Sequence, residues 1–302
     1  VEQKDCDSEQ AKVREINSGI YWFKAEKLSG LLDKLGNNNA AGEYYLTDTV
    51  AVAEKKGVYT ADSTDVVLGA NSRSQLAALN EVARKRKLAE LMDEGVDIPL
   101  SDGIIIGKDV KIGHDTVILP NTIIKGKTVI GNGCEIGPNS YIADCVIEDN
   151  VILNNVQAHE SKVDSKAKAG PFVHLRPNTH LHSGVKIGDF VEVKNSEIGI
   201  NTCIAHLTYI GDSDVGKGVN FGCGCVTANY DGIKKYRTTI GDNAFIGCNT
   251  NLIAPVTIGD NATTAAGSTI TKNVPADSLA VERGQTRIIE HWEKNSKRIK
   301  KA

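Results

Sequence analysis

Residues 104–113 read Ile-Ile-Ile-Gly-Lys-Asp-Val-Lys-Ile-Gly, and the pattern that begins in this stretch decides the fold. Every sixth residue from Ile106 to Ile142 is isoleucine, and glycine follows at positions 107, 113, 131 and 137. A period of six matches neither the turn of an α-helix nor the simple alternation of a hairpin strand. It predicts a solenoid in which each hexapeptide forms one short strand and one turn, with one apolar side chain pointing inward.

The pattern continues through most of the chain after residue 100. Its phase slips over residues 143–168, recovers at Ala169, and breaks again over residues 229–239 before it resumes at Ile240. Three such strands make a triangular coil of about 18 residues, and successive coils stack about 4.8 Å apart. The roughly 170 residues after Gly103 therefore predict about nine coils, a prism about 45 Å long. Such a thin core suits isoleucine and valine, in agreement with an aromatic content of only 5%.

The composition excludes several classes of protein. Lys and Arg number 35 against 38 Asp and Glu, a net charge of −3, so the chain lacks the cationic surplus of a general nucleic-acid binder. No apolar run reaches the roughly 18–20 residues of a membrane span. Seven cysteines in 302 residues fit a reducing cytoplasm better than a disulfide scaffold. The chain starts at Val1 with neither methionine nor a signal peptide, so we expect it to be a piece of a longer protein.

The first hundred residues have a different character. Residues 1–71 predict mixed α/β structure, with an entry loop and then a strand over 15–23, helices at 28–35 and 48–55, and short extended runs at 57–61 and 66–69. These strands are too few to close a sheet. Residues 72–94 predict a helix that ends at Gly95 and serves as a connecting arm. The charge run Arg84-Lys85-Arg86-Lys87 is expected to be a solvated face of this helix.

The chemistry is expected where the repeat is interrupted. The break at residues 229–236 predicts an extruded polar loop, and the spacing from His206 to Phe221 and Cys223 is close to one coil. His206, Asn220 and the mouth of the loop are therefore expected to lie near one another. Arg176 and Lys194 are separated by one standard coil, so their side chains stack; with Lys235 they could form a phosphate pocket, or they could be ordinary surface cations.

Two metal hypotheses are weaker. Cys223 and Cys225 form a Cys-x-Cys pair that could bind a soft metal, but a single pair is more typical of small packed side chains. His174, His180 and His182 suggest a β-helix zinc enzyme of the γ-carbonic anhydrase type. His180 and His182 flank an inward position, so both should point outward, most often into solvent. A third alternative is a structural β-helix without catalysis, in which replacing His206 by alanine changes no activity.

Several strings carry a family resemblance. They are Leu175-Arg176-Pro177, Gly188-Asp189-Phe190-Val191-Glu192-Val193-Lys194, His206-Leu207-Thr208-Tyr209-Ile210-Gly211, Asn229-Tyr230-Asp231-Gly232 and Ala265-Ala266-Gly267-Ser268-Thr269. Together with the hexapeptides they resemble the acetyltransferase domain of the bacterial bifunctional N-acetylglucosamine-1-phosphate uridylyltransferase / glucosamine-1-phosphate acetyltransferase family. Residues 1–71 resemble the end of that family's uridylyltransferase domain. The resemblance implies a mainly β fold, a left-handed parallel β-helix preceded by a partial α/β nucleotidyltransferase domain and a helical arm.

The resemblance also implies an organisation and an activity. Residues 1–71 would be the uridylyltransferase remnant, 72–100 the arm, 101–274 the β-helix acetyltransferase domain and 275–302 a C-terminal tail. The expected reaction is acetyl transfer from acetyl-CoA to the amine of glucosamine 1-phosphate, in a cytoplasmic homotrimer that binds small molecules and no nucleic acid. The family's second reaction uses UTP and Mg²⁺ to make UDP-N-acetylglucosamine. We expect it to be absent here, because its Gly-rich loop and its Mg²⁺-binding Asp would precede Val1.

The same resemblance assigns residues to roles. His206 is the implied base that removes a proton from the amine. The implied ligands of the sugar phosphate are Arg176, Lys194, Tyr209, Asn220 and Lys235. The implied acetyl-CoA contacts are Cys223, Asn229, Tyr230, Cys248, Ala266 and Arg283. Glu2, Asn17 and Asn71 are implied UDP-N-acetylglucosamine ligands, with Asn71 also on Mg²⁺. Cys223 and Cys248 depart from the family, which usually has Ala and Ser at these positions.

Overall fold

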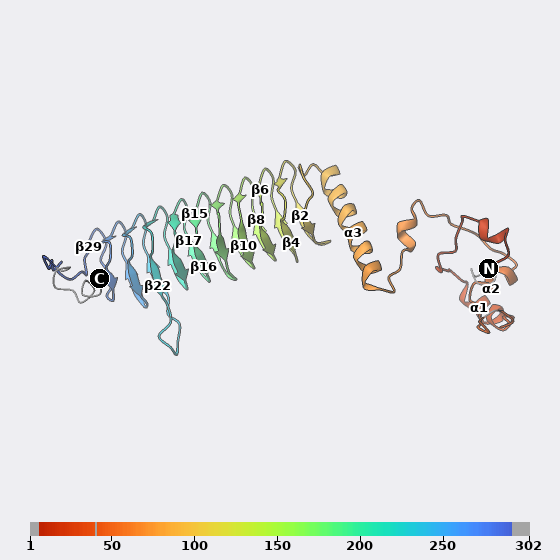
Figure 1. Ribbon diagram of the computed structural model, residues 1–302. Helices are drawn as coiled ribbons and strands as arrows, with labels where there is room; N and C mark the ends of the chain where they lie inside the picture. Colours follow the sequence, from red (N-terminus) through yellow and green to blue (C-terminus); the bar gives the residue numbers. More distant parts are fainter. Residues whose placement is uncertain (1–5, 40, 292–302) are drawn as a thin grey trace, which may run out of the picture. The chain divides into compact units, whose positions relative to one another are not determined.

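The computed structural model describes residues 6–39 and 41–291, and after residue 104 it is a parallel β-helix (Figure 1). Its strands form three sheets, and each strand pairs with the strand one coil away. Nine complete coils and a partial tenth follow one another, in agreement with the predicted number. The predicted hexapeptide solenoid is confirmed.

Each sheet takes one strand from every coil. Sheet 1 contains β1 (Ile105–Ile106), β4 (Ile123–Lys125), β7 (Tyr141–Ala143), β10 (Val156–His159), β13 (Val173–Leu175), β16 (Glu192–Lys194), β19 (Tyr209–Gly211), β22 (Val226–Ala228), β25 (Asn251–Ile253) and β28 (Thr269–Ile270). Sheet 2 contains β2 (Lys111–Ile112), β5 (Val129–Ile130), β8 (Val146–Ile147), β11 (Lys162–Val163), β14 (His180–Leu181), β17 (Glu197–Ile198), β20 (Ser213–Val215), β23 (Thr238–Ile240) and β26 (Val256–Ile258). Sheet 3 contains β3 (Val117–Ile118), β6 (Glu135–Ile136), β9 (Ile152–Leu153), β12 (Lys168–Ala169), β15 (Lys186–Asp189), β18 (Cys203–His206), β21 (Asn220–Phe221), β24 (Phe245–Ile246), β27 (Thr263–Thr264) and β29 (Leu279–Ala280).

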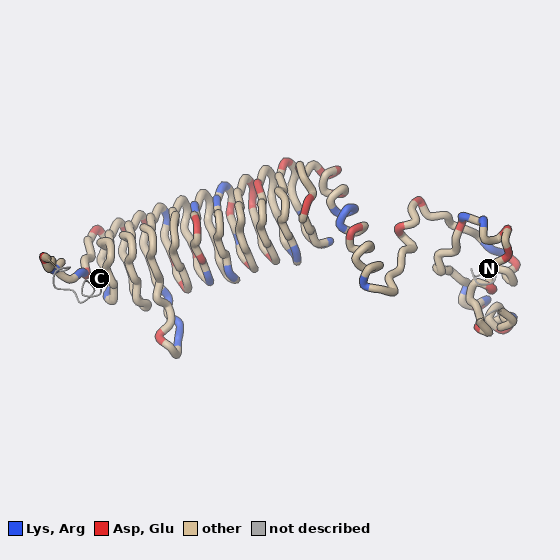
Figure 2. Tube along the Cα trace, viewed as in Figure 1, with Lys and Arg blue, Asp and Glu red and all other residues tan. Residues whose placement is uncertain are grey.

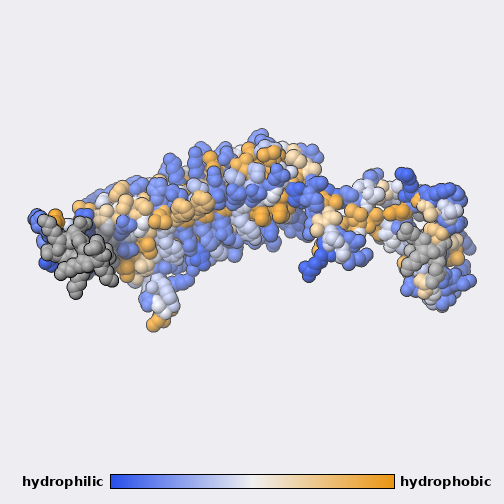
Figure 3. Space-filling view, viewed as in Figure 1, coloured by the Kyte–Doolittle hydropathy of each residue, from blue (hydrophilic) through white to orange (hydrophobic). Residues whose placement is uncertain are grey.

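The core of the β-helix is the column of inward side chains that the period of six predicted. The isoleucines at 118, 124, 136 and 142 have no exposed surface, and Leu175, Leu181, Ile198 and Ile204 continue the column. Burying each such side chain contributes about 1.5–3 kcal/mol. The face of the β-helix seen in Figure 3 is mostly hydrophilic, with apolar patches among the polar areas.

The phase slip in the sequence has a simple structural cause. Tyr141 pairs with Gln157, and Val156 pairs with Val173, so these two coils are shorter than the standard coil of about 18 residues. The shorter coils shift the inward position along the sequence by one or two places and keep it buried. The repeat is therefore unbroken in space.

The corners between strands use a conformation that the glycine pattern did not reveal. Asn121, Asn139 and Asp144 are among many Asn and Asp residues with positive φ, a region that these side chains tolerate better than others. The side-chain amide of Asn121 donates to the Asn139 side chain one coil later, at 3.2 Å. Gly113 is required for a different reason, the close approach of two coils. A Cβ at this position would lie 2.7 Å from the backbone of Gly131 in the next coil, which is too close for any side chain.

Residues before the β-helix form a separate unit, with the division between Val82 and Ala83. It contains α1 (Ala25–Leu32), α2 (Asp48–Val52) and two 3-10 helices, η2 (Gln10–Lys12) and η3 (Thr64–Val67). The helix predicted at 28–35 begins earlier, as α1. The helix predicted at 48–55 ends earlier, as α2, because the backbone of the next residue is extended.

The strands expected in this unit are wrong. The described residues at 15–23, 57–61 and 66–69 form no sheet, and part of the last range is η3. A strand needs a paired neighbour, and Trp22 and Tyr59 are instead almost fully exposed.

The predicted helix at 72–94 is α3 (Arg73–Asp93). Its last part packs on the β-helix, because Leu88 and Leu91 are buried. The expected solvated face is wrong for Arg84, whose guanidinium donates to the carbonyls of Ser101 and Ile104 at 3.0 and 3.3 Å. No helix among the described residues is both long and apolar enough to cross a membrane.

Candidate active site

His206 lies at the corner that leads from sheet 3 to sheet 1. It ends β18, and Asp189 ends β15 directly opposite it in the preceding coil. The two side chains meet with 2.9 Å between His206 Nδ1 and Asp189 Oδ1, while the imidazole remains 60% exposed. This hydrogen bond lowers the pKa of the Asp189 carboxyl. With Nδ1–H donated to Asp189, Nε2 is the nitrogen able to accept a proton from a ligand.

Sequence reasoning gave no role to Asp189. The signal was present, because Asp189 and His206 are register partners and the coil between them is slightly shorter than the standard coil. A search of the sequence for residues separated by one standard coil does not find this pair.

Three cations gather at the other end of the sheet 1 strands. Leu175 pairs with Val193, so Arg176 and Lys194, one residue further on, stack as predicted. Lys235 comes close enough to Lys194 to lower the pKa of its ammonium, with Arg176 adding to the effect. Neither lysine has a carboxylate within 4 Å among the ion pairs of the described residues. A bound phosphate would relieve this repulsion.

Arg176 is not an isolated cation. It donates to Glu192 at 2.8 Å, and this carboxylate raises the pKa of the guanidinium. Glu192 in turn pairs in register with Tyr209 of the next coil. Tyr209 therefore lies on sheet 1 beside Glu192, and its role in holding the sugar stays a prediction.

Asn220 lies further from the base than the sequence suggested. It begins β21 on sheet 3, opposite Cys203, at the other end of the strand direction from His206. The structure shows no direct contact of His206 with Asn220 or with the cations.

The predicted loop is an ordered excursion between β22 and β23 (Figure 1), and Figure 2 shows charges of both signs along it. Tyr230 and Lys235 bridge across it, and Asp231 accepts from the backbone N–H groups of Ile233 and Lys234 at 2.7 and 2.6 Å. At its base the amide of Asn229 donates to Asp212. These bonds position Lys235 beside Lys194, while Tyr230 remains exposed.

Three of the implied coenzyme contacts, Cys223, Cys248 and Ala266, form a row along one corner of the β-helix, which we call the corner row. Phe221 pairs with Ile246, and Ile246 with Thr264, so Cys223, Cys248 and Ala266, each two positions further on, occupy equivalent places in successive coils. Cys223 and Cys248 are exposed. The Arg283 side chain passes close to Gly267, whose Cβ would lie 3.9 Å from its Cδ.

The Cys-x-Cys pair does not form a metal site. Cys225 is buried and its thiol donates to the Gly247 carbonyl at 3.1 Å, whereas Cys223 faces outward. Burial raises the pKa of the Cys225 thiol to about 11. The three-histidine hypothesis also changes, because the ring of His174 on sheet 1 lies near His159 and not near His180 and His182 on sheet 2.

Comparison with known proteins identifies the family. The chain is 48% identical over 295 residues to Bifunctional protein GlmU of Clostridium acetobutylicum, covering 97% of this chain and 65% of that protein. It is 50% identical over 296 residues to Bifunctional protein GlmU of Acetivibrio thermocellus, covering 97% and 64%. For the protein of the same name from Desulfitobacterium hafniense strain Y51, the identity is 45% over 302 residues, covering 99% and 67%. The chain belongs to the GlmU family.

The family confirms the predicted resemblance. The chain spans 64–67% of the length of these GlmU relatives. Residues 237–272 match the model described as "Bacterial transferase hexapeptide (six repeats)". Among solved structures, UDP-N-acetylglucosamine acyltransferase of Francisella novicida is similar with a TM-score of 0.34 and 17% identity, covering 59% of this chain and 65% of that one.

The GlmU resemblance also implied a partial nucleotide-sugar site in the first unit. Glu2 lies outside the described residues. Asn17 donates to the Tyr21 hydroxyl and accepts from the Gly19 N–H, and the Asn71 N–H donates to Gln75. The structure records no contact between Asn17 and Asn71, and no cluster of three ionisable ligands surrounds Asn71 among the described residues. The Mg²⁺ role that the resemblance implies for Asn71 therefore stays a prediction.

Proposed function

We propose that this chain catalyses acetyl transfer from acetyl-CoA to the amine of glucosamine 1-phosphate, giving N-acetylglucosamine 1-phosphate. One observation carries the proposal. The exposed imidazole of His206, held by Asp189, lies at one end of the sheet 1 strands, and the cation cluster lies at the other end of these strands. Membership of the GlmU family supports it.

The residues of the chain suggest how the reaction proceeds. The cluster of Arg176, Lys194 and Lys235 would bind the phosphate, and Tyr209 and Asn220 would hold the sugar. His206 Nε2 would accept a proton as the amine nitrogen bonds to the acetyl carbon. The C–S bond then breaks, and the proton returns from the imidazolium to the coenzyme sulfur, so that free CoA leaves. Asp189 stabilises the imidazolium in between, as the carboxylate partner of a catalytic histidine does.

Acetyl-CoA would lie along the corner row. Cys223, Cys248 and Ala266 are presented on successive coils, Asn229 and Tyr230 lie at the base of the loop, and Arg283 suits a coenzyme phosphate. Because Cys248 replaces the usual serine, any role of a hydroxyl at this position would be lost, while backbone contacts would be retained.

We extend the proposal to the organisation of the protein. The domain boundaries at 71, 100 and 274 remain part of it, although β29 lies beyond residue 274 and still pairs with β27. A homotrimer is supported by an apolar corner beside His206, where the exposed rings of Phe172 and Phe190 stack at 5.2 Å and Leu207 follows one coil later. A cytoplasmic location agrees with free thiols at Cys134, Cys145, Cys203, Cys223, Cys225 and Cys248.

The test is an assay of the purified chain with acetyl-CoA and glucosamine 1-phosphate. The product should be quantified by chromatography, because the exposed Cys223 and Cys248 would react with a thiol reagent. We expect acetylated product, and a loss of about 10²–10⁴ in kcat for His206→Ala. His114→Ala, an exposed histidine elsewhere on the β-helix, is the control. Absence of product, or full activity in His206→Ala, would overturn the proposal and favour a structural β-helix.

A further inference from the structure

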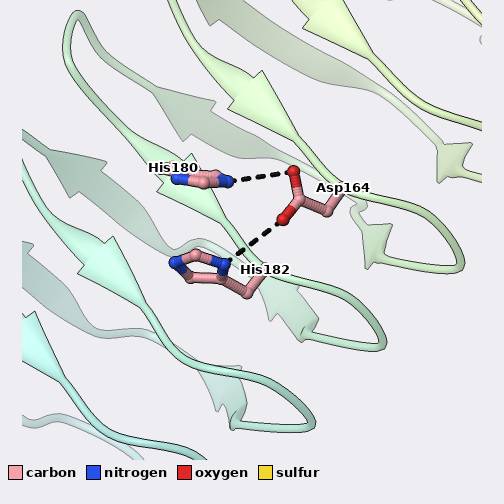
Figure 4. Close-up of side chains that lie close together, drawn as sticks. All are labelled: Asp164, His180 and His182. Carbon is pink, nitrogen blue, oxygen red and sulfur yellow. Dashed lines mark hydrogen bonds and ion pairs between the residues drawn. The ribbon is translucent and has the colours of Figure 1, made fainter.

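Two histidines and two carboxylates meet on the outer face of sheet 2, away from the corner of sheets 3 and 1 that holds His206. β11, β14 and β17 are neighbours, with Lys162, His180 and Glu197 in register. His182 follows β14 on the same outer face, because the intervening Leu181 is buried. Asp164 follows β11 in the same way, and Figure 4 shows its carboxylate beside the two imidazoles, with one oxygen toward each ring.

Each ring nitrogen of both histidines faces a carboxylate oxygen. His180 Nε2 lies 2.9 Å from Asp164 Oδ1, and His182 Nδ1 lies 3.2 Å from Asp164 Oδ2. On the other side, His180 Nδ1 and His182 Nε2 lie 2.9 and 3.0 Å from the same oxygen of Glu197. The two rings are 3.9 Å apart between centroids.

A count of protons shows that this arrangement is incomplete. A neutral imidazole has one N–H donor, and a carboxylate is an acceptor only. Two neutral rings therefore supply two protons for four nitrogen–oxygen contacts. If both N–H groups donate to Glu197, two unprotonated nitrogens face the oxygens of Asp164, lone pair against lone pair. Two added protons would place two imidazolium cations in contact, whereas one metal cation would satisfy both nitrogens and the carboxylate together.

The surrounding charge also favours a cation. Lys162 lies 2.9 Å from Asp164 Oδ1 and 3.7 Å from Glu148, and it is the one ammonium in this group of ion pairs among the described residues. The carboxylates of Glu148, Asp164 and Glu197 thus outnumber it, leaving a net charge of two minus when the rings are neutral. Asp164 is only 13% exposed, so this charge is partly shielded from water.

We propose that Asp164, His180 and His182 bind one divalent transition-metal ion, for which Zn²⁺ is the best match. One ligand atom from each residue already lies within 4.8 Å of the others. Two imidazoles and a carboxylate are typical Zn²⁺ ligands, and water can complete a tetrahedron. Glu197 would accept the remaining N–H of each ring and so fix both tautomers, the usual arrangement around metal-bound histidine. The ion would tie together the coils that contain β11 and β14.

The experiment measures metal binding directly, independently of acetyl transfer. The full chain, stripped with a chelator, is titrated with Zn²⁺ by calorimetry, and Co²⁺ serves as a spectroscopic probe for tetrahedral coordination. We expect one Zn²⁺ per chain and visible Co²⁺ bands. His180→Asn and His182→Asn should each abolish both signals, and Glu197→Ala should weaken binding about 10- to 100-fold. Lys162→Gln should strengthen binding, since the ammonium competes for Asp164.

His114→Asn is the matched control, because His114 contacts a single carboxylate, Asp115, at 2.7 Å. It should bind as the unchanged chain does, and circular dichroism should show that every variant is folded. Absence of stoichiometric binding would overturn the proposal. Binding that persists unchanged in both His180→Asn and His182→Asn would also overturn it and would place the metal elsewhere, for example at the exposed thiols.

Discussion

Single residues determine the chemistry of the candidate site, and Asp189 is the most informative of them. It accepts the Nδ1–H of His206 at 2.9 Å without itself facing the cation cluster. We expect Asp189→Ala to lower kcat about tenfold or more, because the imidazole loses its orientation and the carboxylate that stabilises its charged form.

Asp115→Ala is the control for this prediction, since it removes the carboxylate beside His114 and leaves the site intact. A kcat of Asp189→Ala equal to that of the unchanged chain would contradict this role.

Two buried thiols predict how stability depends on pH. Burial raises the pKa of the Cys145 and Cys225 thiols from 9.0 to about 11. Between pH 9 and 11 the unfolded chain has therefore released protons that the folded chain retains, so the free energy of unfolding falls as pH rises. Below pH 9 this contribution is fully present. The slope is about 1.4 kcal/mol per pH unit for each thiol.

Thermal unfolding at pH 8 and pH 10.5 measures this effect. The double variant Cys145→Ala/Cys225→Ala should lose less stability between the two pH values than the unchanged chain. Equal losses would show that other groups cause the alkaline destabilisation.

Sequence reasoning at this scale succeeded for residues within a motif and failed for their partners. His206, Arg176 and Lys194 could be selected because the family strings and the coil spacing mark them. The partners Asp189, Asp164 and Glu197 could not. Shortened coils place Asp189 opposite His206 and Glu197 opposite His180, and the length of a coil depends on its corners. Asp164 lies one standard coil before His182, but no motif marks it.

At the scale of elements, the loop between β22 and β23 positions one cation for the proposed substrate. Asp231 fixes the loop through backbone bonds that do not involve the Lys235 side chain. Lys235→Met should therefore keep the loop intact and raise the KM for glucosamine 1-phosphate about tenfold or more, by loss of one charge-assisted contact. The kcat should change little. Lys217→Met, which removes a lysine paired with Asp242 at 3.3 Å, should change neither constant.

The strands themselves offer a matched test of the core. Ile124 is fully buried, whereas Ile105, in the neighbouring strand of sheet 1, is 45% exposed. Ile124→Ala should destabilise the β-helix by about 2–5 kcal/mol. Ile105→Ala should cost about 0.5 kcal/mol or less. Hydrogen exchange of the adjacent strands measures both, and similar effects of the two variants would contradict the inward–outward assignment.

The elements before the β-helix show where sequence patterns mislead. An apolar run such as residues 20–23 has the composition of a strand, yet composition cannot supply the neighbouring strand that its backbone needs. The hexapeptides carry no such ambiguity, since each coil pairs with the next copy of itself.

At the scale of the whole β-helix, the period of six predicted both the number of coils and the thin aliphatic core. It could not predict that α3 packs on the first coil. Leu88 is buried there and Arg84 donates to the Ser101 carbonyl, and these tertiary contacts produce no repeating pattern in the sequence.

The dependence of each coil on its immediate neighbours has a mechanical consequence. Pulled apart by its ends in an optical trap, the β-helix should lengthen in a staircase, each step releasing one coil of about 18 residues and about 60 Å of chain. One step should stand out. The coil that leaves Val226 carries the whole loop before it returns to its partner, Asn251. Its release should yield about 85 Å, so the trace itself would record the moment at which the proposed substrate site is lost.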